Sequence, residues 1–223
     1  MPVFDSFSVE YDLYIQTFGL RRFDHFVNLL PKSTACVLDA GCGSGILGLY
    51  LADHVGHLIG VDVSRGMIDL ARRRQAEQRK ANVEFVVGDL MSLCFDDTSF
   101  DCVVSNGALK HTKLELSLPH LRRVVKPGGR ILITDVVSNY PRLNRLPEWA
   151  MLKALKSAPG HALRFGIRTA LRILAFRTSP AWIRNSCSPR PSYMEFHQAC
   201  NRYLPGSRSQ KHSWGISVFW ERV

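Results

Sequence analysis

Several features typical of membrane and secreted proteins are missing from this sequence of 223 residues. No apolar run approaches the roughly 20 residues that a helix needs to cross a bilayer. The first residues, Met1 to Phe7, contain no basic region followed by an apolar one, so no secretory signal is visible. The six cysteines form no CxxC pair and no Cys/His ligand spacing. We therefore expect a cytoplasmic protein with free thiols and no structural zinc.

Acidic residues are scarce in only one part of the chain. Residues 140–190 contain 10 basic residues and a single acid, Glu148, whereas residues 1–139 contain 15 basic and 16 acidic residues. Nearly all of the formal net charge of +10 therefore belongs to one segment. With 46% hydrophobic and 22% charged residues, the chain has ample apolar material for a packed core. Its length suits one domain.

Short apolar strands alternate with helices over most of the chain. The pattern predicts strands at residues 35–40, 57–62, 83–87, 100–105 and 130–136, and helices at residues 46–55, 65–80 and 114–125. Such alternation is typical of right-handed βαβ units, so we expect a Rossmann-like α/β fold: a mostly parallel sheet with helices on both faces. A closing hairpin over residues 207–220 would bring the sheet to seven strands.

Three parts of the chain are expected to differ in role. Residues 1–139 would form an aromatic-rich N-terminal helix, residues 4–18, and the Rossmann-like core that binds a cofactor. Residues 140–190, which contain several prolines and no strand pattern, would form a basic helical lid inserted before the last two strands. Residues 191–223 would add a C-terminal helix and the closing hairpin of the same domain.

A glycine-rich turn follows the first predicted strand and reads Asp39-Ala-Gly-Cys-Gly-Ser-Gly45. Such a turn lets backbone N–H groups approach a ligand at the carboxyl end of the sheet. The literal pattern GxGxxG also occurs, from Gly43 to Gly48, and an acid follows about twenty residues later, so a nicotinamide-dependent Rossmann oxidoreductase has to be weighed. Asp39 opposes that interpretation, because its carboxylate would face a pyrophosphate. It suits a ligand with a cationic amino group.

Five motifs follow one another in order along the chain. They are Val37-Leu-Asp-Ala-Gly-Cys-Gly-Ser-Gly45, Gly60-Val-Asp-Val-Ser64 with Met67, Gly88-Asp-Leu90, Asp101-Cys-Val-Val-Ser-Asn106 and Lys126-Pro-Gly-Gly-Arg130. Over about residues 35–136 the chain resembles class I S-adenosylmethionine-dependent methyltransferases in these motifs and their spacing. The resemblance implies transfer of a methyl group from S-adenosylmethionine. The alternatives are the nicotinamide enzyme and an inactive relative.

The resemblance also implies a role for each motif in binding S-adenosylmethionine. Gly41, Gly43 and Gly45 would form the loop under the methionine part, and Asp39 would order that loop and its contacts with the amino group. Asp62 would accept hydrogen bonds from both ribose hydroxyls.

Further motif positions would surround the adenine and the methionine amino group. Val63 and Met67 would pack on the adenine ring, although Met67 can equally belong to the core. Asp89 and the backbone N–H of Leu90 would contact the adenine edge. The backbone carbonyl of Asn106 would accept a hydrogen bond from the methionine amino group.

The segment after the fourth strand opens onto the transferred methyl group in this family. Related sequences often carry a histidine there that faces the substrate, which makes His111 the candidate general base. A helix-capping or loop histidine is an equal alternative. Lys110 is expected to be solvated, and Asp101 is expected to be structural.

The methyl acceptor is expected to be a small molecule, hydrophobic or amphiphilic, such as a natural product, a quinone or a lipid-like compound. Nucleic-acid methylation is the alternative that the high pI suggests. Against it, the chain has neither the proline-containing tetrad of base amino-methyltransferases nor the Pro-Cys or Thr-Cys of cytosine C5 enzymes, and it carries no recognisable nucleic-acid-binding module.

The basic segment also suggests a surface function. Apolar residues recur there at helical spacing beside three arginines that step by four: Leu163, Ile167, Ala170, Leu171 and Leu174, with Arg164, Arg168 and Arg172. This pattern is compatible with peripheral contact with an anionic membrane, with reception of an anionic substrate, or with a lid whose apolar face packs on the enzyme and whose arginines are solvated.

Overall fold

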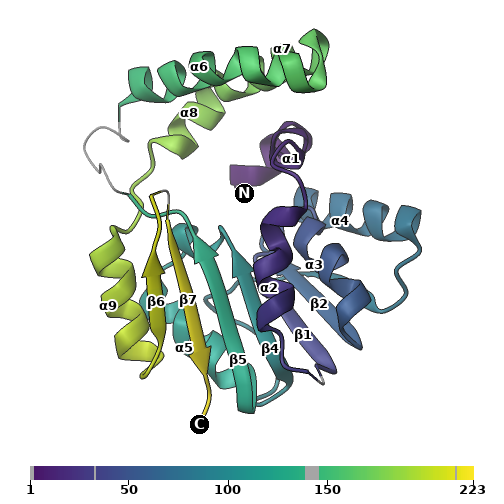
Figure 1. Cartoon of the computed structure of the whole chain (residues 1–223), viewed down its shortest axis with the longest axis vertical. Helices are drawn as coiled ribbons and strands as arrows, with labels where there is room; N and C mark the ends of the chain where they lie inside the picture. Colours follow the sequence, from purple (N-terminus) through teal and green to yellow (C-terminus); the bar gives the residue numbers. More distant parts are fainter. Residues whose placement is uncertain (1–2, 33, 139–145, 214) are drawn as a thin grey trace.

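Seven strands form one sheet in the computed structural model, which describes residues 3–32, 34–138, 146–213 and 215–223 (Figure 1). Their order is β3-β2-β1-β4-β5-β7-β6. The strands are β1 (Cys36–Ala40), β2 (His57–Asp62), β3 (Val83–Val87), β4 (Phe100–Asn106), β5 (Val125–Asp135), β6 (Arg208–Lys211) and β7 (Ile216–Glu221). The first five are parallel, and β7 runs antiparallel to both β5 and β6. The predicted seven-stranded, mostly parallel sheet is confirmed.

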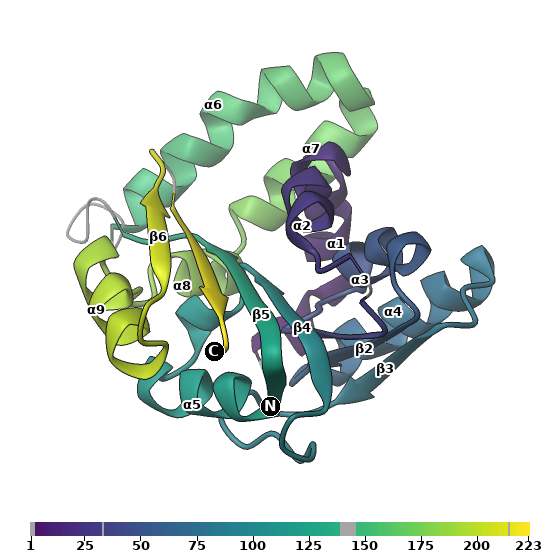
Figure 2. The same ribbon diagram turned by 60° about the horizontal axis from the view of Figure 1, so that its bottom comes forward.

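Helices cover both faces of this sheet, as Figure 2 shows from a second direction. One face carries α2 (Asp24–Leu29), α3 (Ile46–Leu51) and α4 (Arg65–Gln78), and the other carries α5 (Leu114–Val124) and α9 (Tyr193–Tyr203). Neighbouring residues of β1 point to opposite faces, so Val37 packs with Phe26 and Ile68, while Leu38 packs with Leu118. The sheet is therefore buried on both sides, which explains its near-continuous apolar strands.

The N-terminal segment differs from the single helix predicted over residues 4–18. It consists of a short 3-10 helix, η1 (Val3–Ser6), and then α1 (Ser8–Gln16), with non-helical backbone at Phe7. The break turns Asp5 toward α4, where its Oδ1 accepts the N–H of Gly66 at 3.0 Å and the hydroxyl of Ser64 at 2.5 Å. The carboxylate thus satisfies a donor at the start of α4 that a helix leaves free. The helix α2 and the preceding 3-10 turn η2 (Arg21–Phe23) were not predicted.

Three helices between β5 and α9 lie beyond the carboxyl ends of the parallel strands (Figure 1). They are α6 (Pro147–Phe165), α7 (Ile167–Arg177) and α8 (Pro180–Ser186). An aromatic cluster joins these helices to α1, with Phe7 5.5 Å from Phe176 and Tyr11 5.7 Å from Trp182 between ring centroids. The predicted boundary at residue 140 lies outside the described residues. Within the described ranges, no helix combines the length and the apolar character that crossing a bilayer requires.

Asp101, the second residue of β4, ties the starts of three strands together. Its Oδ2 accepts the N–H groups of Ala35 at 3.0 Å and Cys36 at 2.7 Å, and its Oδ1 accepts a hydrogen bond from Lys126 at 2.7 Å. Burial alone would raise the pKa of Asp101, but the donors of Lys126, Cys36 and Ala35 outweigh it and hold the pKa below its ordinary value. The expected structural role of Asp101 is confirmed.

We expect Asp101→Asn to lower the free energy of unfolding at pH 7 by about 1.5–3 kcal/mol, because the donors lose a charged acceptor. The folded-state pKa is depressed, so this stabilisation is present above the ordinary value of 3.8 and is lost as the pH falls through the folded value. Urea unfolding of both proteins at pH 7 and at successively lower pH measures the difference. A difference that stays constant down to acid pH would contradict the account.

Candidate active site

The loop between β1 and α3 is a backbone cradle that depends on glycine. Gly41, Gly43 and Gly45 have φ angles of +79°, +54° and +78°, in the left-handed region that other residues rarely adopt. A Cβ on Gly41 would lie 2.1 Å from the Cβ of Ala108, and one on Gly45 would lie 2.6 Å from the ring of Phe85. A Cβ on Gly43 would meet nothing within 4 Å. The loop is therefore packed from below and open above Gly43.

Asp62, at the end of β2, fixes the shape of this loop. Its Oδ2 accepts the N–H of Gly43 and its Oδ1 accepts the N–H of Ser64, both at 2.9 Å. The carbonyl of Val61 adds a bond from the N–H of Gly41 at 2.8 Å. Burial raises the pKa of Asp62 despite the N–H groups of Ser64 and Gly43. Each carboxylate oxygen offers two lone pairs, so Asp62 can accept further bonds from ligand hydroxyls.

Asp39, the penultimate residue of β1, is buried behind the glycine loop. Its Oδ2 has no hydrogen-bond partner among the described residues. Burial, followed by the nearby charge of Asp62, raises the pKa of Asp39 to about 7. A cationic amino group in the cradle would stabilise the charged form of Asp39. The acid thus fits the ligand chemistry expected from the sequence.

The residues predicted to contact adenine surround the ends of β2 and β3. Val63 is 50% exposed, whereas Met67 is 2% exposed and already lies in the interior. The Oδ1 of Asp89 accepts the N–H of Met91 at 2.9 Å and shapes the turn after β3, beside the buried Leu90. Their adenine contacts stay predictions, and of the first two residues Val63 has far more free surface to offer.

The segment after β4 closes the opposite side of the cradle. The hydroxyl of Ser105 donates to the carbonyl of Ala40 at 2.8 Å, which draws the ends of β4 and β1 together. Asn106 ends β4, and the 3-10 turn η4 (Leu109–His111) follows at once. Asn106 and His111 therefore reach the same edge of the sheet as the glycine loop.

His111 as a whole is exposed, while its ring meets the ring of Phe4 edge-on at 5.4 Å between centroids. Loss of hydration where the imidazole lies against the protein, followed by the charges of Lys110 and Arg190, lowers the pKa of His111 to about 3. The imidazole is therefore neutral at pH 7. It can accept a hydrogen bond, but it is a much weaker base than an ordinary histidine.

Lys110 is not solvated, contrary to the prediction. Its side chain is 10% exposed and forms an ion pair with the fully buried carboxylate of Asp135, with 3.4 Å between Nζ and Oδ1. The ammonium also donates to the carbonyl of Gly107, and the backbone N–H of Lys110 donates to Asp135 Oδ2 at 3.0 Å. The buried acid at the end of β5 draws the lysine inward. Burial lowers the pKa of Lys110.

Arg190 lies near His111 and Tyr11, and sequence reasoning gave neither Arg190 nor Tyr11 a role. The N–H of Ser138 donates to the carbonyl of Pro191 at 3.0 Å, which brings Arg190 to the end of β5. The buried Nε of Arg190 has no hydrogen-bond partner among the described residues. Burial lowers the pKa of Arg190, with Asp135 and Tyr11 opposing. Because Asp135 already pairs with Lys110, this acid does not by itself balance the positive charge of Arg190 as well.

Tyr11 lies close both to Arg190 and to Asp62 of the cofactor site. Burial raises the pKa of the Tyr11 hydroxyl to about 12, and among the smaller contributions are the charges of Asp62 and of Arg190. The ring of Tyr11 lies 5.1 Å from that of Phe4. The only signal in the sequence was the aromatic spacing of residues 4–18, which gives no role to a single tyrosine.

Asp12 attaches α1 to the site. It accepts hydrogen bonds from the hydroxyl of Ser44 in the glycine loop at 2.5 Å and from Arg74 of α4 at 2.8 Å. Asp12 is only 6% exposed, and its ion pair with Arg74 balances its charge away from water. Together with Asp5, it holds the N-terminal segment against the loops that follow β1 and β2. This segment therefore forms a wall of the site.

The strand order distinguishes the two cofactor classes that the glycine loop left open. Dinucleotide-binding Rossmann sheets have the order 3-2-1-4-5-6, whereas here the antiparallel β7 lies between β5 and β6. Residues 37–129 match the family model described as a methyltransferase domain. The strand order and this match support a class I S-adenosylmethionine-dependent methyltransferase domain over these residues.

Known methyltransferases are similar to this chain in sequence and in fold. A demethylmenaquinone methyltransferase of Lactococcus lactis is 31% identical over 150 residues, which cover 63% of this chain and 59% of that protein. A phosphoethanolamine N-methyltransferase of Triticum aestivum is 34% identical over 125 residues, covering 55% of this chain and 25% of that protein. A methyltransferase structure from Aquifex aeolicus has a TM-score of 0.58 at 16% identity and covers 92% of this chain and 90% of that one. The chain thus spans less than two thirds of the length of the two enzymes matched by sequence.

The open space above Gly43 gives a test of the cradle with a matched control. Gly43→Ala and Gly128→Ala both place an alanine at positive φ, +54° and +75°, where its Cβ meets nothing within 4 Å. Each should lower the free energy of unfolding by about 1–2 kcal/mol. Only Gly43→Ala should weaken S-adenosylmethionine binding, by at least about tenfold, because its methyl group enters the cradle. Calorimetric titration of both variants with S-adenosylmethionine checks this. Equal affinities would show that the ligand does not bind against Gly43.

Proposed function

We propose that this chain transfers the methyl group of S-adenosylmethionine to a small hydrophobic or amphiphilic acceptor. The observation that carries the proposal is the cradle at the ends of β1 and β2: an open, positive-φ glycine loop bonded to Asp62, with Asp39 buried behind it. Acids at these two positions suit a ligand with hydroxyls and a cationic amino group. They would oppose the pyrophosphate of a dinucleotide.

The residues of the cradle would each hold one part of the cofactor. Gly41, Gly43 and Gly45 form the floor under the methionine part, while Asp39 and the carbonyl of Asn106 attract its amino group. Asp62 accepts from the ribose hydroxyls. Val63, Met67, Asp89 and Leu90 remain the proposed adenine contacts. When bound, S-adenosylmethionine supplies an activated methyl group on a sulfonium, so the protein has mainly to position the acceptor in line with it.

His111 and Arg190 would then act on the acceptor. The lowered pKa of His111 suits a neutral hydrogen-bond acceptor that orients a hydroxyl of the acceptor molecule, rather than a base that takes the proton of the nucleophile. Arg190 provides the charge that an acceptor anion needs, since the nearby Asp135 is already paired with Lys110. We propose that the nucleophile is held as an anion, such as a phenolate or an enolate, beside Arg190.

The aromatic rings around His111 and Tyr11 favour an acceptor with a substantial apolar part. Phe4 meets His111, Tyr11 meets Trp182 of α8, and Phe7 contacts Phe176 of α7. In this proposal residues 140–190 act as a lid over the acceptor. An acceptor of this kind partitions into bilayers, so peripheral contact with an anionic membrane through the lid is part of the proposal. The cytoplasm is the proposed compartment, where its free thiols stay reduced.

Methyl transfer from radiolabelled S-adenosylmethionine tests the acceptor class, with a short-chain demethylmenaquinol and phosphoethanolamine as probes. We expect labelled quinol product. Arg190→Gln should lower kcat/KM by about 10- to 100-fold, because a charged hydrogen bond to the anion is lost, and Arg190→Lys should restore part of it. With His111 neutral, the wild-type pH profile should show no inflection near pH 6.5.

Two results would contradict this assignment. Absence of labelled product from the quinol, in a protein that binds S-adenosylmethionine, would exclude the proposed acceptor class. An inflection near pH 6.5 that disappears in His111→Gln would make His111 an ordinary general base and leave Arg190 without its proposed role.

A further inference from the structure

The helices α6 and α7 form a hairpin whose outer side is apolar and unpaired. The single residue Gly166, with a φ of +84°, separates them, and Arg177 near the end of α7 donates to Ser157 in the middle of α6. The chain therefore reverses at Gly166, and the two helices lie against each other (Figure 2). The tip of the hairpin consists of the residues on either side of this turn.

Two apolar stripes run along α7, and they face in different directions. Ala170, Ile173 and Phe176 are buried, and Phe176 packs on Phe7 and Tyr14 of the N-terminal segment. The predicted stripe is therefore split, because Ala170 belongs to this buried side. A packed lid needs only the buried side, so the outer stripe requires another explanation.

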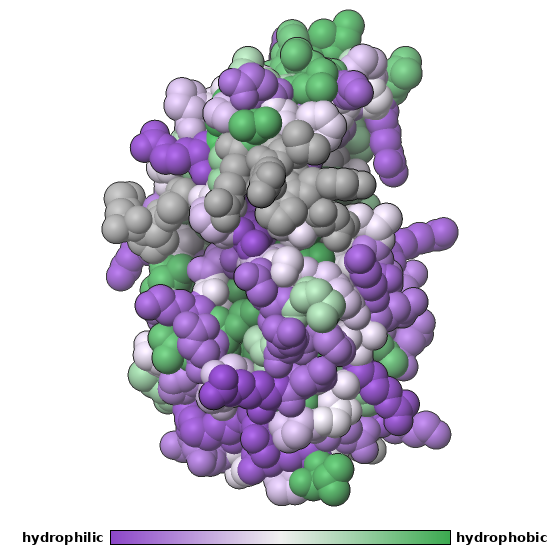
Figure 3. Space-filling model, turned by 90° about the vertical axis from the view of Figure 1, so that its left-hand side faces the viewer, coloured by the Kyte–Doolittle hydropathy of each residue, from purple (hydrophilic) through white to green (hydrophobic). Residues whose placement is uncertain are grey.

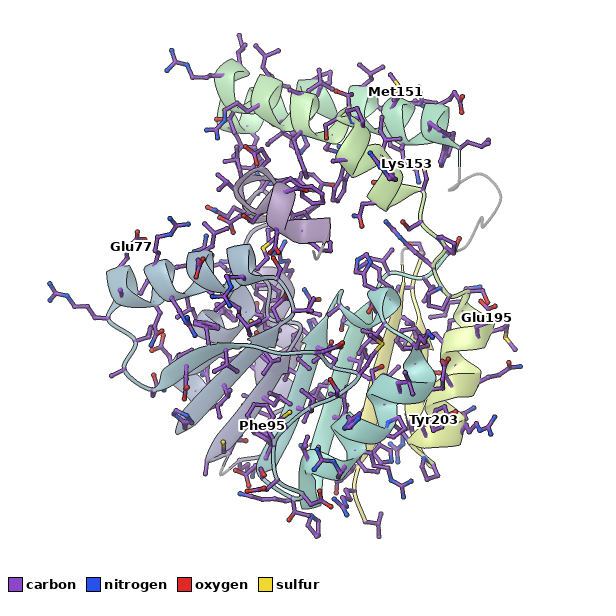
Figure 4. All side chains as sticks on the ribbon, turned by 180° about the vertical axis from the view of Figure 1, so that it is seen from behind. Glu77, Phe95, Met151, Lys153, Glu195 and Tyr203 are labelled. Carbon is purple, nitrogen blue, oxygen red and sulfur yellow. The ribbon has the colours of Figure 1, made fainter. Side chains whose placement is uncertain are left out.

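The outer stripe surrounds the tip of the hairpin. Leu163, Ile167 and Leu171 are 91%, 72% and 60% exposed. Met151, Leu152 and Leu155 extend the apolar surface along α6, each at least 40% exposed. Figure 3 shows apolar residues at the top of the molecule, where α6 and α7 lie, and in Figure 4 Met151 and Lys153 project from different sides of α6. Side chains this large are seldom left so exposed together without a partner.

The charge beside the outer stripe has a single sign. Arg164, Arg168 and Arg172 are exposed and alternate with the three apolar residues of the tip. Glu148 is the sole acid of α6 and α7, and it lies in the first turn of α6, far along the helix from the tip. A leucine and isoleucine stripe beside arginines, with no acid on α7 and none on α6 beyond its first turn, is typical of helices that lie in the interface of an anionic bilayer.

We propose that the α6–α7 tip, made of Leu163, Ile167 and Leu171 with Arg164, Arg168 and Arg172, docks the enzyme on an anionic phospholipid surface. The apolar side chains enter the headgroup region and the guanidinium groups contact lipid phosphates. The inner side of the same hairpin packs on α1, which carries Tyr11, a residue close to the proposed acceptor site. Resting on the proposed function, this arrangement places the methyl-transfer site next to a membrane from which an amphiphilic acceptor is taken.

Sedimentation with large unilamellar vesicles tests the docking surface. The probes are vesicles of phosphatidylcholine alone and of phosphatidylcholine with about one third phosphatidylglycerol, at low and at high salt. The wild-type chain should bind the anionic vesicles, with much weaker binding at high salt and on neutral vesicles. Arg164→Gln, Arg168→Gln and Arg172→Gln should each reduce partitioning about fivefold, the equivalent of about 1 kcal/mol per charge. Leu163→Ser/Ile167→Ser/Leu171→Ser should reduce it at least about tenfold.

Matched controls come from exposed residues on other elements. Leu29→Ser/Leu116→Ser/Met194→Ser removes three apolar side chains that are 39%, 45% and 56% exposed, and Arg73→Gln/Arg122→Gln/Arg208→Gln removes three exposed charges, as many as the three tip arginines together. Both control variants should bind the anionic vesicles like the wild type, apart from the small effect of overall charge. Loss of binding in a control equal to that in the tip variants would overturn the proposal.

Other outcomes separate this proposal from its rivals and from the proposed function. Absence of binding to every vesicle would overturn the docking surface. Dimers seen by sedimentation velocity that the tip variants dissociate, without vesicle binding, would assign the tip to a second copy of the chain instead. S-adenosylmethionine titrated into the same samples tests the cofactor separately. Vesicle binding without S-adenosylmethionine binding would support the docking surface but contradict the methyltransferase function.

Discussion

The bond between Asp62 and the N–H of Gly43 is the constraint on which the site depends. It joins the end of β2 to a loop that leaves β1 with three glycines at positive φ. Without that acceptor, the N–H of Gly43 would lose its partner, and the loop would be joined to β2 through the carbonyl of Val61 alone. The parallel pairing of β1 with β2 brings the two strand ends to the same edge of the sheet. The fold thus places Asp62 within reach of Gly43, and the resulting bond shapes the loop that forms the site.

A second set of carboxylates extends this arrangement to the N-terminal segment. Asp5 attaches η1 to the start of α4, and Asp12 attaches α1 to Ser44 of the glycine loop. These bonds place Phe4 and Tyr11 between the cradle and the helices above it. The same segment therefore contacts the cofactor loops through its acids and the α7–α8 helices through its aromatic rings. A change in either set of contacts would therefore shift the residues that surround His111.

Local patterns predicted the central sheet well because its strands are apolar, short and separated by clear turn signals. The ranges of β2 and β3 agree with the prediction at every residue. The site acids Asp39 and Asp62 could be predicted for a related reason, since each ends a buried strand beside a glycine or a serine turn. Their predicted roles in cofactor binding came from the order of the five motifs along the chain.

Long-range contacts account for what the sequence did not show. Lys110 looked like a surface residue until the buried Asp135, 25 positions later, drew it inward. Arg190 lay within a basic segment where nothing local distinguished it from nine other cations, and the long-range pairing of Ser138 with Pro191 brings it near the end of β5. Likewise, helical periodicity found the apolar residues of α7, but it could not say which stripe packs on α1 and which remains exposed.

Calorimetric titration of the wild-type chain with S-adenosylmethionine, beside a parallel titration with NAD, tests the central claim most directly. An open cradle backed by Asp39 and Asp62 predicts binding of one S-adenosylmethionine per chain with a dissociation constant on the order of micromolar, and no heat from NAD. Binding of NAD without binding of S-adenosylmethionine would contradict the account.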